Sequence, residues 1–234
     1  MFMKISILTL FPEMFSGPFD YSIIKRARMK KIVDINYVNI REFGIGQHKS
    51  VDDKPYGGGL GMIIRVDVLD KAISYALDKT LGSKDQKILL LGAQGKTFNQ
   101  KKAKSLSKLK HLILVCGHYE GVDERVKKII DEEISIGDFI VTGGEIPAMT
   151  VVDSVVRLKK GVLREGATKT ESFSPLLEYP QYTRPRIYKN MAVPAILTSG
   201  DHTKISEWRK SASIKNTRKL RPDILKSSIK AKKD

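Results

Sequence analysis

The chain has 234 residues, 41% of them hydrophobic and 29% charged, so it is long enough to bury its own core and too apolar for a wholly disordered protein. Lys and Arg number 42 against 26 Asp and Glu. This net charge of +16 indicates a polyanionic partner, and nucleic acid fits best. A basic surface without a specific partner is the alternative.

The cysteine and apolar content predict the compartment. Cys116 is the single cysteine, which excludes an intrachain disulfide, and the four histidines are too scattered for a zinc site. The opening MFMKISILTLFPEMF has neither the basic start nor the cleavage site of a signal peptide, and no run of roughly 18 apolar residues occurs. We therefore expect a cytoplasmic protein without a membrane span.

Short apolar runs alternate with helical patterns through the first two thirds of the chain. The runs predict strands at 4–10, 33–38, 87–92, 111–116 and 139–143. The amphipathic segments predict helices at about 22–31, 66–79, 99–107, 122–132 and 146–158. Continuously apolar strands that alternate with helices are typical of a mostly parallel sheet, so we expect an α/β domain over 1–160.

The last third of the chain has a different composition. Residues 161–177 are rich in Gly, Pro, Ser and Thr and predict a linker or functional loop. Residues 178–234 predict a small basic helical domain, with a helix start at Asp201, further helical character at 216–230, and Trp208 in its core. Residues 202–234 carry +8, half the net charge, and the end KSSIKAKKD predicts a solvated tail.

Three glycine-rich segments follow strands and indicate a ligand site. They are LLLGAQG (89–95), LVCGHYEG (114–121) and IGDFIVTGG (136–144), whereas the dinucleotide and Walker A fingerprints are missing. Glycine lets a ligand approach the backbone, so three such loops predict one pocket at the carboxyl edge of the sheet. Each segment alone can be an ordinary turn.

Acidic residues accompany these glycines. Glu120, Asp123, Glu124, Asp138 and Glu145 fall within or beside the three segments. Carboxylates favour a cationic ligand, so a sulfonium or amino group fits this pocket better than a phosphate. Asp123 and Glu124 have the alternative role of stabilising the first turn of the next helix.

Further candidates lie outside these loops. In the predicted helix 146–158, Arg157 either forms a structural ion pair with Asp153 four residues earlier or lies at the pocket rim. DDKPYGGGLGM (52–62) predicts a close-approach loop or a flexible turn. Cys116 and His118 have no evident third group to orient them, which disfavours a nucleophile and base pair.

The motifs YGGGLGM, LVCGHYEGVDERV, SIGDFIVTGGEIPAM, DSVVR and YPQYTRP, in this order, resemble the bacterial tRNA (guanine-N1)-methyltransferase family of the SPOUT superfamily. The resemblance implies a mostly parallel sheet with a deep trefoil knot, which topology rules alone would not predict, and a small helical C-terminal domain. It also implies homodimers with shared active sites. The implied reaction moves a methyl group from S-adenosylmethionine to N1 of the guanosine immediately 3′ of the anticodon in tRNA, which maintains the reading frame.

The resemblance also implies roles for individual residues. Cofactor binding falls to Leu91, Gly92, Ala93, Gly117, Glu120, Ile136, Gly137, Asp138, Phe139, Ile140, Val141, Thr142, Gly143 and Gly144. We expect the target guanine and the RNA to be bound by Asp52, Asp53, Tyr56, Gly57, Gly58, Gly59, Arg184, Lys204, Arg209 and Lys210. Magnesium supports activity in the family, but no motif here specifies a metal site.

Guanine N1 carries a proton, so the reaction needs a general base. The resemblance assigns this base to Glu171 of the partner subunit and assigns Arg157 to the charge that develops on O6. The family has Asp where Glu171 stands and GLL where this chain has PLL, and Glu165 and Glu178 are weaker candidates for the base.

Two other functions remain open at this point. An RNA-binding protein without activity would account for the charge but not for three glycine loops with carboxylates. Another SPOUT methyltransferase, acting on ribosomal RNA or a different tRNA position, would share the fold and the cofactor. Binding of S-adenosylmethionine would distinguish a methyltransferase from the first alternative. Methylation of transcripts with an altered target base would distinguish the second alternative from an enzyme specific for that guanosine.

Overall fold

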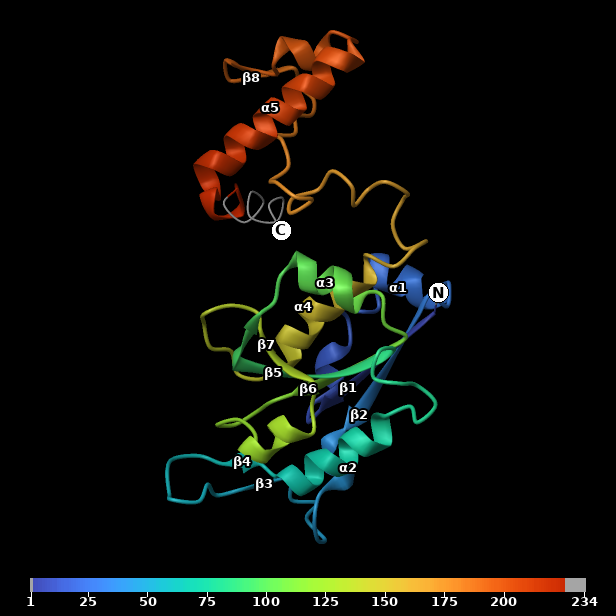
Figure 1. The fold of residues 1–234 in the computed structure, drawn as a ribbon, viewed down its shortest axis with the longest axis vertical. Coiled ribbons are helices and arrows are strands. Elements are labelled where there is room, and N and C mark those ends of the chain that lie inside the picture. The colour runs from blue at the N-terminus through green and yellow to red at the C-terminus, as the bar shows by residue number, and fades with distance from the viewer. Residues whose placement is uncertain (1, 226–234) are drawn as a thin grey trace. The chain divides into compact units, whose positions relative to one another are not determined.

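The structure, a computed structural model, describes residues 2–225 and divides into two compact units, Met1–Arg164 and Glu165–Asp234. The first unit contains a five-stranded sheet in the order β2-β1-β6-β5-β7, in which all neighbouring strands are parallel (Figure 1). Its strands are β1 (Met3–Thr9), β2 (Val33–Asn39), β5 (Gln86–Thr97), β6 (His111–Cys116) and β7 (Glu132–Ser135). The expected domain limits at 160 and 177 stay predictions.

Helices cover both faces of this sheet. On one face, Met3, Ile5 and Ile7 of β1 pack in a core with residues of three helices, α1 (Ser22–Met29), α3 (Gln100–Leu106) and α4 (Glu145–Val156). On the other face, Leu8 packs with α2 (Val66–Ala76) and with the 3-10 helix η3 (Glu124–Lys128). Figure 1 shows α1, α3 and α4 opposite α2 across the sheet. Because every residue of the central strand β6 is buried, its continuous apolar sequence is explained.

Short elements complete the first unit and form most of the second. The first contains η1 (Pro12–Phe15), η2 (Ile40–Phe43) and the antiparallel pair β3 (Asp52–Asp53) and β4 (Ile63–Ile64). The second contains η4 (Ala195–Thr198), the antiparallel pair β8 (Ile187–Tyr188) and β9 (Met191–Ala192), and α5 (His202–Leu220). The parallel sheet with flanking helices and the C-terminal helix confirm the predicted fold class.

The second unit is organised around α5. Asp201 accepts a hydrogen bond from the Lys204 backbone N–H at 3.0 Å, which is the helix start that the sequence predicted. Trp208 is half-buried, with its ring centroid 6.4 Å from that of Tyr182. The predicted tail KSSIKAKKD lies outside the described residues. Within residues 2–225, no helix is both long and apolar enough to cross a membrane.

Two sequence predictions around residue 130 are wrong. Residues 139–143 form a loop instead of a strand, and the predicted helix 122–132 is reduced to η3. β7 pairs with the edge of β5. Just before β7, the Asp131 carboxylate accepts a hydrogen bond from the Ile88 backbone N–H of β5 at 2.7 Å. With that edge taken, the apolar segment 139–143 is left exposed, and Ile140 is 83% accessible.

β5 also extends beyond its predicted end at residue 92. Its pairing with β7 shifts between Leu91 and Lys96, so the glycine segment 92–95 is a bulge inside a strand. A Cβ on Gly95 would overlap the backbone of Ile134, which explains why glycine is needed there. The bulge therefore lies directly against the backbone of β7.

Candidate functional site

The bulge of β5 and the loops that follow β6 and β7 enclose a pocket of about 210 Å³ at the carboxyl edge of the sheet. Twelve of the expected cofactor residues line it, whereas Gly137 and Asp138 do not. Residues that the sequence reasoning missed also line it: His118, Tyr119, Gly121, Ile134, Ser135 and Pro147. Pro147 was missed because it belongs to a helix rather than to a loop, and Ile134 and Ser135 because β7 was not predicted.

Glycines make the pocket possible by letting backbone segments meet. The Gly144 backbone N–H donates to the Gly117 carbonyl at 2.7 Å, which joins the loop after β7 to the end of β6. A Cβ on Gly144 would lie 2.5 Å from the Cα of Cys116, closer than side chains pack. By contrast, a Cβ on Gly121 would meet nothing within 4 Å, so the pocket is open at that position.

A second hollow adjoins the pocket along the bulge of β5. The two share six lining residues, namely Leu91, Gly92, Ala93, Gly117, Glu120 and Gly121. Glu133 also lines the second hollow, and its carboxylate occupies the space beside Gly92 that a Cβ would fill. Sequence reasoning missed Glu133 because β7 was not predicted.

Lys127 holds two carboxylates beside this hollow, with its Nζ 2.9 Å from Glu124 and 3.5 Å from Glu133. The hydrogen bond that Lys127 donates to Glu124 raises the pKa of Lys127 above its ordinary value, so the ammonium stays charged. Glu133 is only 14% exposed at its side chain, so its partial burial is compensated by this cation. Lys127 therefore neutralises part of the negative charge that the sequence predicted around the glycines.

A buried polar pair joins the end of β1 to the start of α4. Thr9 donates from Oγ1 to Oε1 of Glu145 at 2.7 Å, and both residues are buried. Glu145 is the first residue of α4, where a carboxylate is stabilised by the helix dipole. Glu145 does not line the pocket, so its role is to fix the start of α4.

Cys116 and His118 show no sign of nucleophilic chemistry. Burial, with a smaller contribution from Glu145, raises the pKa of the Cys116 thiol well above its ordinary value, so the reactive thiolate is disfavoured. The His118 ring packs 5.0 Å from both Phe11 and Tyr119. These contacts agree with the sequence interpretation.

The glycine-rich loop after β3 lies beside the cofactor pocket. The Glu120 backbone N–H donates to the Met62 carbonyl at 3.0 Å, and the Ile64 N–H donates to the Gly121 carbonyl at 3.0 Å. Gly61 has φ +78, and a Cβ there would lie 2.6 Å from Cγ of Glu120. The sequence placed residues 52–62 and Glu120 in one site without evidence of contact, and the structure brings them together.

The outer part of this loop projects into solvent. Tyr56 is fully exposed, and Gly57, Gly58 and Gly59 all have positive φ values, as glycine readily permits. Asp52 pairs with Ile64 in the short β3–β4 ladder. The exposed aromatic ring and the open backbone leave this loop available to a partner.

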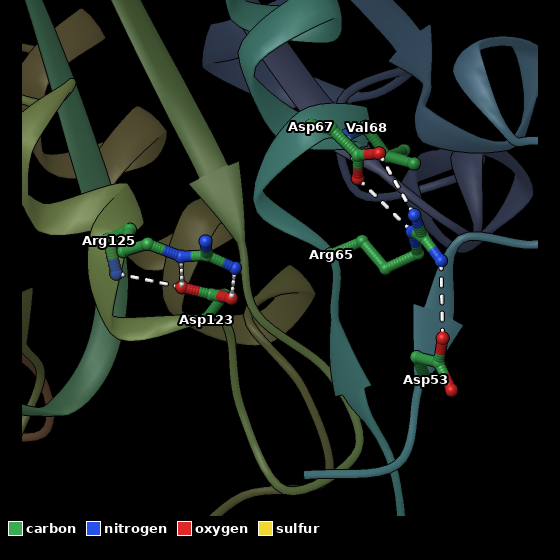
Figure 2. Close-up of polar contacts among 6 residues, drawn as sticks. All are labelled: Asp53, Arg65, Asp67, Val68, Asp123 and Arg125. Carbon is green, nitrogen blue, oxygen red and sulfur yellow. Dashed lines mark hydrogen bonds and ion pairs between the residues drawn. The ribbon is translucent and has the colours of Figure 1, made fainter. Parts of the chain in front are cut away.

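Two arginines are held by carboxylates at the foot of the loop, as Figure 2 shows. Arg65 contacts Asp53 at 3.2 Å and Asp67 at 3.0 Å, and Arg125 contacts Asp123 at 2.7 Å. The hydrogen bond from Arg125 lowers the pKa of Asp123 below its ordinary value. Asp123 also accepts from the Arg125 backbone N–H and caps η3, which confirms its structural interpretation.

The remaining predicted site residues lie elsewhere. Arg157 is the C-cap of α4, ten residues beyond Pro147, so about 15 Å of helix separates it from the pocket-lining end. Glu171, Arg184, Lys204, Arg209 and Lys210 belong to the second unit. Lys204 pairs with Asp201 at 3.2 Å. Over residues 2–225, no group of three or more His, Cys, Asp or Glu side chains is placed to hold a metal ion.

A pocket at the carboxyl edge of a parallel sheet, lined by glycine backbone, is typical of α/β proteins that bind a small molecule there. Residues 3–227 match the model of the family described as tRNA (Guanine-1)-methyltransferase TrmD. The chain belongs to this family.

Relatives named tRNA (guanine-N(1)-)-methyltransferase are similar along nearly their whole length. The one from Dictyoglomus turgidum is 50% identical over 99% of this chain and 94% of its own length. Those from Carboxydothermus hydrogenoformans and Clostridium beijerinckii are each 53% identical, over 96% and 99% of this chain and 88% and 96% of their own lengths.

Proposed function

We propose that this protein is a cytoplasmic enzyme that transfers the methyl group of S-adenosylmethionine to N1 of the guanosine immediately 3′ of the anticodon in tRNA. The observation that carries the proposal is the glycine-lined pocket next to the exposed loop 52–62, in a chain half identical to proteins of that name over nearly their full length. The pocket suits a cofactor, and the adjacent loop suits a nucleobase.

The residues of the pocket fit S-adenosylmethionine. Leu91, Ile136 and Pro147 provide apolar surface for an adenine ring, and the glycine backbone offers amide groups at close range. Glu120 supplies a carboxylate for the cationic part of the cofactor. When bound, the cofactor supplies an electrophilic methyl group on a sulfonium.

The chain's own residues prepare the guanine. Exposed Tyr56 and the glycines after it receive an unstacked base, and the Asp53 carboxylate, which Arg65 contacts at 3.2 Å, contacts the edge of that base. Glu171 accepts the N1 proton, which leaves a lone pair on N1. Arg157 stabilises the negative charge that spreads to O6.

The position of Arg157 supports a site made by two chains. Within one chain, Arg157 lies at the opposite end of α4 from the pocket, and the intervening helix of about 15 Å is longer than an arginine side chain can span. A second copy of the chain would bring its own Arg157 and Glu171 to the pocket. We therefore propose a homodimer in which each active site combines residues of both subunits.

The reaction and its target are tested together with methyl-labelled cofactor and tRNA transcripts. Transcripts with guanosine after the anticodon should yield N1-methylguanosine on nuclease digestion, and those with adenosine there should yield none. Equal labelling of both transcripts, or labelling of ribosomal RNA alone, would overturn the proposed target. Labelling of neither, with the cofactor unbound, would overturn the reaction.

A further inference from the structure

The second unit contains a groove that the methyl-transfer site does not use. It measures about 660 Å³, within the range of about 300–1,000 Å³ typical of small-molecule sites. Val193, Leu197 and Ile205 form an apolar part of its lining and are half-buried. The groove lies wholly inside this unit, between the segment 179–186, η4 and α5.

The groove is strongly cationic. Arg184, Arg186 and Arg209 line it, and no acidic residue does. Among residues 2–225, none of these three guanidinium groups is paired with a carboxylate. The nearby Glu178 accepts a hydrogen bond from Gln181 at 2.5 Å. Three arginines that pair with no carboxylate among the described residues favour an anionic ligand.

The groove also offers aromatic surface. Tyr179 and Tyr182 line it, and the Arg209 guanidinium lies 4.8 Å from the ring centroid of Tyr179, stacked as a cation on its face. Tyr182 is 49% exposed, a large apolar area to leave in water. A planar ligand can stack on Tyr182 and on the stacked Arg209.

We propose that this groove binds one unstacked nucleotide of the substrate RNA, outside the nucleotide that is methylated. The base packs on Tyr182 and the apolar residues, and the flanking phosphates contact Arg184 and Arg186. Paired RNA shows this groove only its phosphates, so the combination of aromatic and cationic surface selects a single-stranded loop. The inference rests on the proposed function, because it takes tRNA as the substrate.

The test uses the full chain, without cofactor, and a set of labelled anticodon-arm hairpins. Each hairpin lacks the base of one loop nucleotide, and binding is followed by fluorescence anisotropy. Removal of one particular base, other than the methylated guanine, should weaken binding about 10-fold. Tyr182→Ala should weaken binding of the intact hairpin by a similar factor. In this variant, removal of that base should cause almost no further loss of affinity.

The matched control is Tyr188→Ala, which removes an equally exposed tyrosine of the same unit, 55% accessible and outside the groove. It should leave both affinities unchanged. Arg186→Gln should reduce the slope of log affinity against log salt concentration by about 1, the value for one phosphate contact.

Several outcomes would overturn the groove site. One is equal loss in both tyrosine variants, and another is an effect of base removal that persists in Tyr182→Ala. A third is a loop-free duplex that competes as well as the hairpin. Failure of the proposed function would look different. If the hairpins bind as expected but are never methylated, methyl transfer is refuted and the groove site stands. If the hairpins are methylated but Tyr182→Ala binds them with unchanged affinity, the groove site is refuted and methyl transfer stands.

Discussion

Gly144→Ala should open the cofactor pocket, because this glycine lies against the end of β6. Its φ of −76° suits any residue, so the cost of alanine there is purely steric. The new Cβ would lie 2.5 Å from the Cα of Cys116, and ordinary contact begins at 3.4 Å, so the two segments must separate by about 1 Å. That movement stretches the 2.7 Å hydrogen bond from Gly144 to Gly117 beyond its useful range.

The two costs can be estimated separately. Overpacking costs about 1–3 kcal/mol and the lost hydrogen bond about 1 kcal/mol, so Gly144→Ala should lower the free energy of unfolding by about 2–4 kcal/mol. For a chain of this size, Tm should fall by about 5–15 °C. The dissociation constant for S-adenosylmethionine, measured by calorimetry below the transition, should rise at least 10-fold because the loops that line the pocket separate.

Gly82→Ala is the matched control. Gly82 is exposed, its φ is not positive, and a Cβ there would meet nothing within 4 Å. Alanine at this position should leave cofactor binding unchanged and stabilise the chain by up to about 1 kcal/mol, through the unfolded state. Wild-type affinity and Tm in Gly144→Ala would refute the steric argument and the role of this contact in the pocket.

Three further predictions concern a buried histidine and the two proposed catalytic residues. Burial lowers the pKa of His111 to about 4 from 6.5, so the unfolded chain binds the proton first as pH falls, and stability that is complete above about pH 6.5 should decline toward pH 4. Urea titrations should show a loss of about 2 kcal/mol between pH 7.5 and 5 that is absent from His111→Gln, and an equal loss in that variant would contradict the assignment. Glu171→Gln should lower kcat by about 100-fold with unchanged cofactor affinity, while Glu165→Gln should stay within a few-fold; equal effects of the two would reject Glu171 as the base. At a cofactor concentration that saturates the wild type but not Gly144→Ala, the Arg157→Ala and Gly144→Ala chains should each have low activity alone. Randomly paired, they should regain about one quarter of the wild-type activity, whereas no recovery would refute a site shared between subunits.

The sequence predicted those parts of the fold that depend on local patterns. β1 and β6 were found because a strand buried on both faces is mostly apolar, and β2 because its buried apolar residues alternate with exposed polar ones. α5 was found because Asp201 caps its first turn. β7 was missed because its sequence, EEIS, has two charged residues. Its place depends on the free edge of β5 and on the contact of Asp131 with Ile88, and both partners belong to a strand that lies about 40 residues earlier in the chain.

The same distinction applies to the site. Glycine segments after apolar runs indicated the pocket correctly because close backbone approach needs glycine wherever the partner segment comes from. Contacts between distant residues could not be predicted, among them Thr9 with Glu145 and Met62 with Glu120. Glu133 was missed for the same reason, since only the bulge in β5 brings its carboxylate beside Gly92.

The central claim is that the bulge of β5 and the loops after β6 and β7 hold the cofactor that donates the methyl group. A crystal structure of the protein with S-adenosylhomocysteine, the product of the reaction, tests it most directly. Density for the product among Leu91, Gly117 and Gly144, with its sulfur facing loop 52–62, is the predicted result. Product bound elsewhere, with these loops packed against each other and the pocket closed, would contradict the account.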